Sequence, residues 1–146
     1  MRHRSSALLV TVLVLAPTLA FTSTRGSAMW MGTVQGKDGA ALSGSVQMSP
    51  GTEAGSTVVE VKLKGDAAAS VRPWHIHIGS CTQPGGVLGG GKSYTPVTVD
   101  ATGAGESKAT LPIVMPDTGS YYVNIHESAA NMAKIAGCGN LMLHKM

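Results

Sequence analysis

The sequence is poor in charged and aromatic residues. Charged residues make up 13% of its 146 residues and aromatic residues make up 4%, whereas glycine occurs 19 times. The formal net charge is +3, but Arg2, Arg4 and Arg25 supply all of this excess, so residues 29–146 carry as many acids as bases. Because binding to a nucleic-acid backbone requires a basic patch or stripe, we expect no nucleic-acid partner. A hydrophobic content of 43% with so little charge also excludes a disordered chain.

Long apolar runs are also missing, with one short exception near the N-terminus. Residues 7–21 form an apolar stretch that is shorter than the roughly 20 residues needed to span a membrane. A positively charged start precedes it, and small residues ending at Ala20 and at Ala28 offer two cleavage sites, a pattern typical of secretory signals. We therefore predict a signal peptide at residues 1–28 and a single domain at residues 29–146. The mature protein is expected in the periplasm or outside the cell with no stable membrane anchor; a retained anchor is the alternative.

Cysteine is scarce, since the chain contains only Cys81 and Cys138. An even pair in an exported protein favours a disulfide, because the compartments outside the cytoplasm are oxidising. The alternative is two free thiols or two metal ligands. A disulfide would tie the middle of the chain to its last predicted strand.

Helical periodicity is weak, and residues 29–146 read instead as short strands between glycine-rich turns. Alternating apolar and polar residues indicate half-buried strands. The strand candidates are 31–35, 41–48, 58–64, 74–78, 95–99, 108–114, 120–126 and 140–143. About eight short strands at this spacing predict an all-β sandwich or barrel. Residues 128–135 are the one predicted helical piece, and residues 85–91 are predicted as a glycine-rich loop.

Two histidines in a strand-like stretch are the first candidate metal ligands. His75 and His77 are two residues apart, so in a strand they point to the same face. The opposite face, expected to point inward, holds Trp74, Ile76 and Ile78. Two imidazoles at this spacing can converge on one ion with metal–nitrogen bonds of about 2 Å.

A third histidine lies in a second strand-like stretch. His126 shares a face with Tyr122 and Asn124, while Val123 and Ile125 are expected to point inward. If the two strands are neighbours, the three imidazoles meet on the outer wall of the barrel and form a metal site. The alternative is that these histidines are structural or merely exposed.

The choice of metal follows from the donor atoms. Three imidazoles suit copper or zinc, and the affinity order of divalent ions peaks at copper. Thioethers would favour Cu(I), but we expect most methionines of residues 29–146 to fill the core or lie in the tail. His144 is an alternative fourth ligand. The chain has no Gly-x-Ser-x-Gly motif, so nothing indicates a serine nucleophile.

Four segments, in this order, resemble the copper/zinc superoxide dismutase family. They are Trp-His-Ile-His-Ile-Gly-Ser-Cys at 74–81, Val-Thr-Val-Asp-Ala-Thr-Gly-Ala-Gly at 97–105, Val-Asn-Ile-His-Glu at 123–127 and Gly-Cys-Gly-Asn-Leu at 137–141. The resemblance implies a Greek-key β-barrel that covers most of the chain after the predicted signal.

The same resemblance implies roles for particular residues. The family's copper ligands correspond to His75, His77 and His126. Its disulfide corresponds to Cys81 and Cys138, the pair already expected from export. The implied activity is the dismutation of superoxide at a copper ion.

The chain departs from that family at the zinc site and at the active-site arginine. No histidine occurs between residues 82 and 119, where the family places the histidine that bridges copper and zinc. One copper ion and no zinc are therefore expected. No arginine lies shortly before Cys138, and Lys134 is the candidate to replace it as the catalytic cation.

The chain is also similar to the chordin-type CHRD domain. That domain carries a His-Ile-His-Gly segment and a Tyr-Val-Asn-Val-His segment, and the second resembles Tyr-Val-Asn-Ile-His at 122–126. Three hypotheses of function follow: a copper-dependent superoxide dismutase, a non-catalytic copper-binding or copper-carrying module, and a CHRD-like structural domain. The expected partner is superoxide or a copper ion, and the sequence leaves the oligomeric state open.

Overall fold

The computed structural model describes residues 28–145. The predicted signal peptide, apart from Ala28, lies outside the described residues and stays a prediction. The described part contains ten strands, one short 3-10 helix and no α-helix, so the all-β prediction is confirmed. Within residues 28–145, no helix has the length and apolar character needed to cross a membrane.

The elements are short and are joined by tight turns. They are β1 (Ala28–Gly36), β2 (Ser43–Pro50), β3 (Thr57–Lys64), β4 (Val71–Arg72), β5 (Trp74–Ser80), β6 (Gln83–Val87), the 3-10 helix η1 (Gly91–Ser93), β7 (Val97–Thr98), β8 (Gly105–Leu111), β9 (Tyr121–Ser128) and β10 (Asn131–Lys145).

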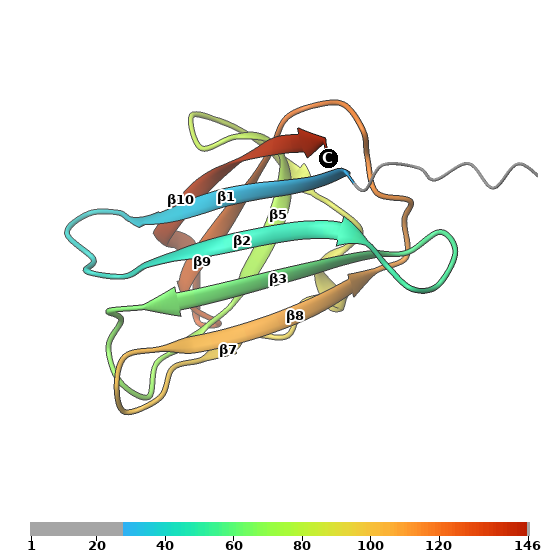
Figure 1. Cartoon of the computed structure of the whole chain (residues 1–146). Coiled ribbons are helices and arrows are strands. Elements are labelled where there is room, and N and C mark those ends of the chain that lie inside the picture. The colour runs from blue at the N-terminus through green and yellow to red at the C-terminus, as the bar shows by residue number, and fades with distance from the viewer. Residues whose placement is uncertain (1–27, 146) are drawn as a thin grey trace, which may run out of the picture.

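Eight of these strands form one antiparallel sheet in the order β6-β5-β9-β10-β1-β2-β3-β8. The sheet curls, so that β5 and β9 lie behind the layer of β1, β2 and β3 in Figure 1. After β3 the chain crosses to β5, and β10 finally returns to lie beside β1, as the closing strand of a Greek key does. β4 and β7 pair separately. This half-closed barrel agrees with the predicted barrel or sandwich of about eight strands.

Every predicted strand overlaps an observed one, but two strands were missed. β4 is only two residues long, and β6 contains Pro84, Gly85 and Gly86, which are residue types that strands usually avoid. β6 forms at the edge of the sheet, where it pairs with β5 alone. The predicted loop at 85–91 is therefore partly strand.

The predicted helix at 128–135 is wrong. β9 runs to Ser128, a two-residue turn follows, and β10 begins at Asn131. Alanines in this stretch favour a helix locally, but the chain instead turns back on β9, where Asn131 pairs with Ser128 and Ile135 pairs with His126. A bulge near Ile135 lets β10 continue past this irregular start.

The core lies between the two layers of the curled sheet. No phenylalanine occurs in residues 28–145, and the largest fully buried side chain is that of Trp74. Trp30 also faces inward, and its indole N–H donates a hydrogen bond to the Pro116 carbonyl. Aliphatic residues fill most of the remaining space: Val34, Leu42, Val46, Met48, Val59, Val61, Leu63, Ile76, Val97, Leu111, Val123 and Ile125.

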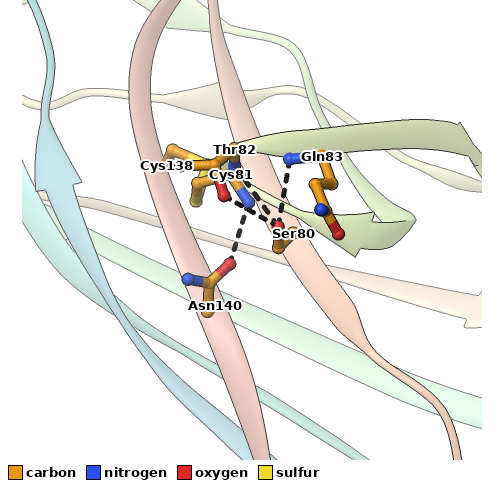
Figure 2. Close-up of a disulfide and its surroundings, with 6 residues drawn as sticks. All are labelled: Ser80, Cys81, Thr82, Gln83, Cys138 and Asn140. Atoms are coloured by element: carbon orange, nitrogen blue, oxygen red, sulfur yellow. Dashed lines mark hydrogen bonds between the residues drawn. A yellow bond between two sulfur atoms is a disulfide. The ribbon is translucent and has the colours of Figure 1, made fainter.

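The predicted disulfide is present. Cys81 lies in the turn between β5 and β6, and Cys138 lies on β10, with 6.1 Å between their Cα atoms. Figure 2 shows that Asn140 supports the same turn, since its side-chain oxygen accepts a hydrogen bond of 2.9 Å from the Cys81 N–H. The Ser80 hydroxyl accepts a further bond from the Gln83 N–H. The disulfide therefore anchors the β5–β6 turn to the last strand.

Candidate metal centre

Pairing between β5 and β9 brings three histidines to one face of the sheet. The register places His75 opposite Asn124, and the His126 N–H donates to the Pro73 carbonyl at 2.8 Å. His126 thus lies diagonally across from His75. Side chains on directly and diagonally opposite positions of two antiparallel strands are close enough to interact. The predicted neighbourhood of the two stretches is confirmed.

The three imidazoles gather closely enough to hold one metal ion. His75, His77 and His126 each offer a ring nitrogen, and these nitrogens lie within 4.8 Å of one another. The closest pair is His75 Nδ1 and His126 Nε2, at 3.1 Å. With metal–nitrogen bonds of about 2.1 Å, tetrahedral ligand atoms lie about 3.4 Å apart, so small side-chain rotations complete the site.

Two backbone carbonyls fix the orientation of two of these rings. His126 Nδ1 lies 2.6 Å from the Met132 carbonyl oxygen, and His77 Nδ1 lies 3.0 Å from that of Gly85. A carbonyl only accepts, so each Nδ1 carries the proton and each Nε2 keeps its lone pair. This is the support that metal-binding histidines usually have. Sequence reasoning missed both partners, because a backbone carbonyl leaves no mark on residue type.

One of the two Nε2 atoms that keep a lone pair is buried without a partner. The Nε2 atom of His77 is inaccessible to solvent, and no hydrogen-bond partner for it is found among the described residues. A buried polar atom left unpaired costs free energy, so it calls for a ligand or an ion. The donor set therefore fits a metal ion on chemical grounds as well as by distance.

Two tyrosines surround the cluster. The Tyr94 ring packs edge-on against His75 with 5.1 Å between ring centroids, and Tyr122 stacks on His77, also at 5.1 Å. His126 is only 6% exposed, and Tyr122 is 1% exposed. The position of the histidines agrees with the expectation that they meet on the outer wall and not in the core. They do lie opposite the core face, but tyrosines and the neighbouring strands cover that wall.

One inward assignment is wrong. Trp74 and Ile76 are fully buried as expected, but Ile78 is 52% exposed. Ile78 comes just before Gly79, whose φ of 110° accompanies an irregularity in the β5–β6 pairing. At this point β5 runs past the end of the core.

Burial keeps two rings of the cluster, those of His75 and His126, neutral. Desolvation, followed by the proximity of the other two rings, lowers the pKa of His75 to about 4. Burial also lowers the pKa of His126, although its bond to the Met132 carbonyl works in the opposite direction. Near neutral pH both rings are therefore uncharged, which is the state that binds a metal ion.

The candidate catalytic cation lies beside the cluster but is paired. The Lys134 ammonium contacts the carboxylate of Glu127, the residue after His126, and this bond raises the pKa of Lys134. Arg72 donates to the Glu127 carbonyl at 2.7 Å and forms a two-pronged bond with the Asp66 carboxylate. The role of Lys134 toward superoxide stays a prediction.

His144 does not join the cluster. It pairs with Met29 on β1, whereas His126 pairs with Ile135 at the other part of β10. The strand between Ile135 and His144 extends over roughly 30 Å at about 3.3 Å per residue. His144 is therefore not a fourth ligand of the same ion.

The comparisons with known proteins add no family to this picture. A scan against models of protein families finds no match, and a search among curated proteins finds no relative. What the structure itself provides is a cluster of three imidazoles on two paired strands that could hold a metal ion.

Proposed function

We propose that this protein is an exported, superoxide dismutase-like copper protein that holds one copper ion at His75, His77 and His126 and holds no zinc. The observation that carries the proposal is the convergence of three imidazole nitrogens within 4.8 Å. The carbonyls of Gly85 and Met132 support it, because they leave two Nε2 lone pairs for the ion.

Copper is favoured by the donor atoms. Imidazole binds several first-row metals, and among divalent ions of this series copper forms the most stable complexes with a given set of ligands. The disulfide agrees with an oxidising compartment, in which Cu(II) is the ordinary form of the metal. The exclusion of zinc rests on the lack of any histidine between residues 82 and 119.

The chain's own residues have separate tasks in this proposal. The three histidines bind the ion, and the Gly85 and Met132 carbonyls orient two of them. Tyr94 and Tyr122 pack against the rings and keep water away from part of the site. Bound copper would supply the Cu(II)/Cu(I) couple, which oxidises one superoxide to dioxygen and reduces the next, with two protons, to hydrogen peroxide.

A second candidate is a copper-carrying module without catalysis. The observation that favours it is the pairing of both cations beside His126, since Lys134 is bound to Glu127 and Arg72 to Asp66. A paired cation attracts an anion less strongly than a free one, which weakens the capture of superoxide. A CHRD-like structural domain without metal is the third candidate.

Metal loading followed by a superoxide assay separates these candidates. The protein is incubated with equimolar Cu(II) and Zn(II), its metal content is measured, and the decay of superoxide is then followed by stopped flow. One copper with fast decay supports the dismutase, and one copper without decay supports the carrier. His126→Ala is expected to abolish copper binding, whereas His144→Ala, which lies elsewhere on β10, is the matched control. Retention of copper by His126→Ala would exclude the site.

A further inference from the structure

Methionines and a histidine gather on a second face of the barrel, away from the histidine cluster. β1 and β10 pair antiparallel with Met31 opposite Met142 and Met29 opposite His144. Alternate residues of a strand share a face, so all four side chains lie on the same side of the two strands. Figure 1 shows β1 and β10 side by side, with β2 next to them.

This face is the outer one. Trp30 and Leu141, which alternate with the methionines, are buried, whereas Met31 is 42% exposed and Met142 is 69% exposed. Core packing therefore does not explain these thioethers. Opposite residues of antiparallel strands have Cβ atoms about 4.5–5.5 Å apart, and methionine side chains are long and flexible. Their sulfur atoms can thus converge on one point.

A shallow hollow occupies the same place. It has a volume of about 540 Å³, and its lining includes Met31, Met142 and His144. Thr33 and Gln47 line it as well, and no charged side chain lies among the described residues of its wall. A site without carboxylates suits neither calcium nor magnesium, which require oxygen ligands. Neutral thioethers with one imidazole are soft donors, and these select Cu(I).

We propose that Met29, Met31, Met142 and His144 form a second, surface-exposed metal site that binds a soft monovalent cation, Cu(I). It differs from the three-histidine site in its donors, because sulfur replaces most of the nitrogen. It also lies apart from it, since roughly 30 Å of extended strand separate Ile135, the partner of His126, from His144. The proposal does not depend on the function of the histidine cluster.

Ag(I), a redox-inert analogue of Cu(I), tests the site directly. The probe is added to protein labelled with carbon-13 at the methionine methyl groups, and the methyl signals are followed by NMR. We expect one equivalent to shift the signals of Met29, Met31 and Met142, while those of the core residue Met48 and of Met115, which packs against the core, stay in place. Shifts spread evenly over all methionines, or no shifts at all, would overturn the proposal.

Variants complete the test. Met31→Leu/Met142→Leu should weaken Cu(I) binding, measured anaerobically against a chromophoric competitor, by at least about ten-fold. Met115→Leu is the matched control, because this methionine packs against the core and does not line the hollow. His126→Ala should leave this Cu(I) binding intact. A failure of the proposed histidine site can thus be distinguished from a failure of the methionine site. Cu(II) binding as in wild type would show that the double variant is folded. An unchanged Cu(I) affinity in that folded variant would refute the site.

Discussion

His126 is the residue on which the histidine cluster depends most. It is 6% exposed, its Nδ1 donates to the Met132 carbonyl, and its Nε2 lies 3.1 Å from His75 Nδ1. The two ring nitrogens of His126 therefore have separate roles. Nδ1 holds the ring in place through the backbone, and Nε2 points into the histidine cluster. His75 and His77 lie on a single strand and are partly exposed, so they complete a site that His126 anchors.

At the residue scale, acid should destabilise the metal-free protein through His75. Its pKa is about 4 in the folded state and about 6.5 when exposed, so between these pH values the unfolded chain binds a proton that the folded chain does not. The free energy of unfolding should therefore fall as the pH decreases from about 6.5 to about 4. Urea denaturation at several pH values measures this effect. His75→Gln should flatten the profile in this window, and an equally steep profile in that variant would contradict the assignment.

Removal of the hydroxyl group should affect the free energy of unfolding differently for the two tyrosines beside the cluster. The Tyr122 hydroxyl is buried without a partner among the described residues, whereas the Tyr94 hydroxyl donates to the Leu88 carbonyl at 2.8 Å. Tyr122→Phe is expected to leave the free energy of unfolding unchanged or raise it slightly, and Tyr94→Phe to lower it by about 1 kcal/mol. Chemical denaturation compares the two variants. A clear loss of stability in Tyr122→Phe would show that its hydroxyl has a partner.

At the scale of elements, the β5–β6 turn links the disulfide to the histidine cluster. Cys81 in this turn is bound to Cys138 on β10, and β6 carries the Gly85 carbonyl that orients His77. β6 is an edge strand whose residues are all exposed, so little apolar burial holds it in place. The disulfide therefore supports both the fold and one ligand of the cluster.

Removal of the disulfide should lower both the free energy of unfolding and the affinity of the histidine cluster for Cu(II). The cross-link joins residues 57 positions apart, and constraint of the unfolded chain over a loop of this size contributes roughly 4 kcal/mol. Cys81→Ser/Cys138→Ser should lose about this much free energy of unfolding in urea denaturation and should bind Cu(II) less tightly. Wild-type protein treated with a reductant is the control and should match the variant. A loss below about 1 kcal/mol would contradict the expectation.

At the scale of the whole molecule, charge neutrality limits the attraction of anions. Residues 29–146 carry equal numbers of acids and bases, and two of the cations, Arg72 and Lys134, are paired with Asp66 and Glu127. Electrostatic steering speeds association only where a field of one sign surrounds the site. The equal numbers of acids and bases therefore predict little steering of anions toward the three histidines.

Superoxide decay should consequently depend little on salt. The screening length falls from about 30 Å at 0.01 M salt to about 10 Å at 0.1 M, which suppresses any long-range steering. We expect the rate constant, measured by stopped flow, to change by less than about two-fold over this range. Lys134→Gln should leave this dependence as it is. A steep decrease with salt that Lys134→Gln removes would instead make Lys134 the guiding cation.

Much of the architecture could be predicted from residue patterns, because strands with one buried face show it in their alternation. The same alternation placed His75 and His77 on one face of a strand and His126 on the outward face of a second strand, and the paired cysteines indicated the disulfide. The local residue pattern gave a wrong prediction where pairing with a distant strand determines the structure. Residues 128–135 contain alanines that favour a helix, but this segment forms a turn and pairs with β9. The residue pattern also failed for backbone partners such as the Gly85 carbonyl.

The methionines illustrate the same limit. Met31 and Met142 lie far apart in the sequence, and composition alone predicts that methionines fill the core. Only the register of β1 against β10 shows that these two face each other on the outside.

Electron paramagnetic resonance of the Cu(II)-loaded protein tests the central claim most directly. The spectrum and its pulsed variants report how many imidazole nitrogens bind the ion. We predict one copper with three imidazole ligands in wild type and in His144→Ala, and loss of this signal in His126→Ala. A signal from fewer imidazoles in wild type, or an unchanged signal in His126→Ala, would contradict the account.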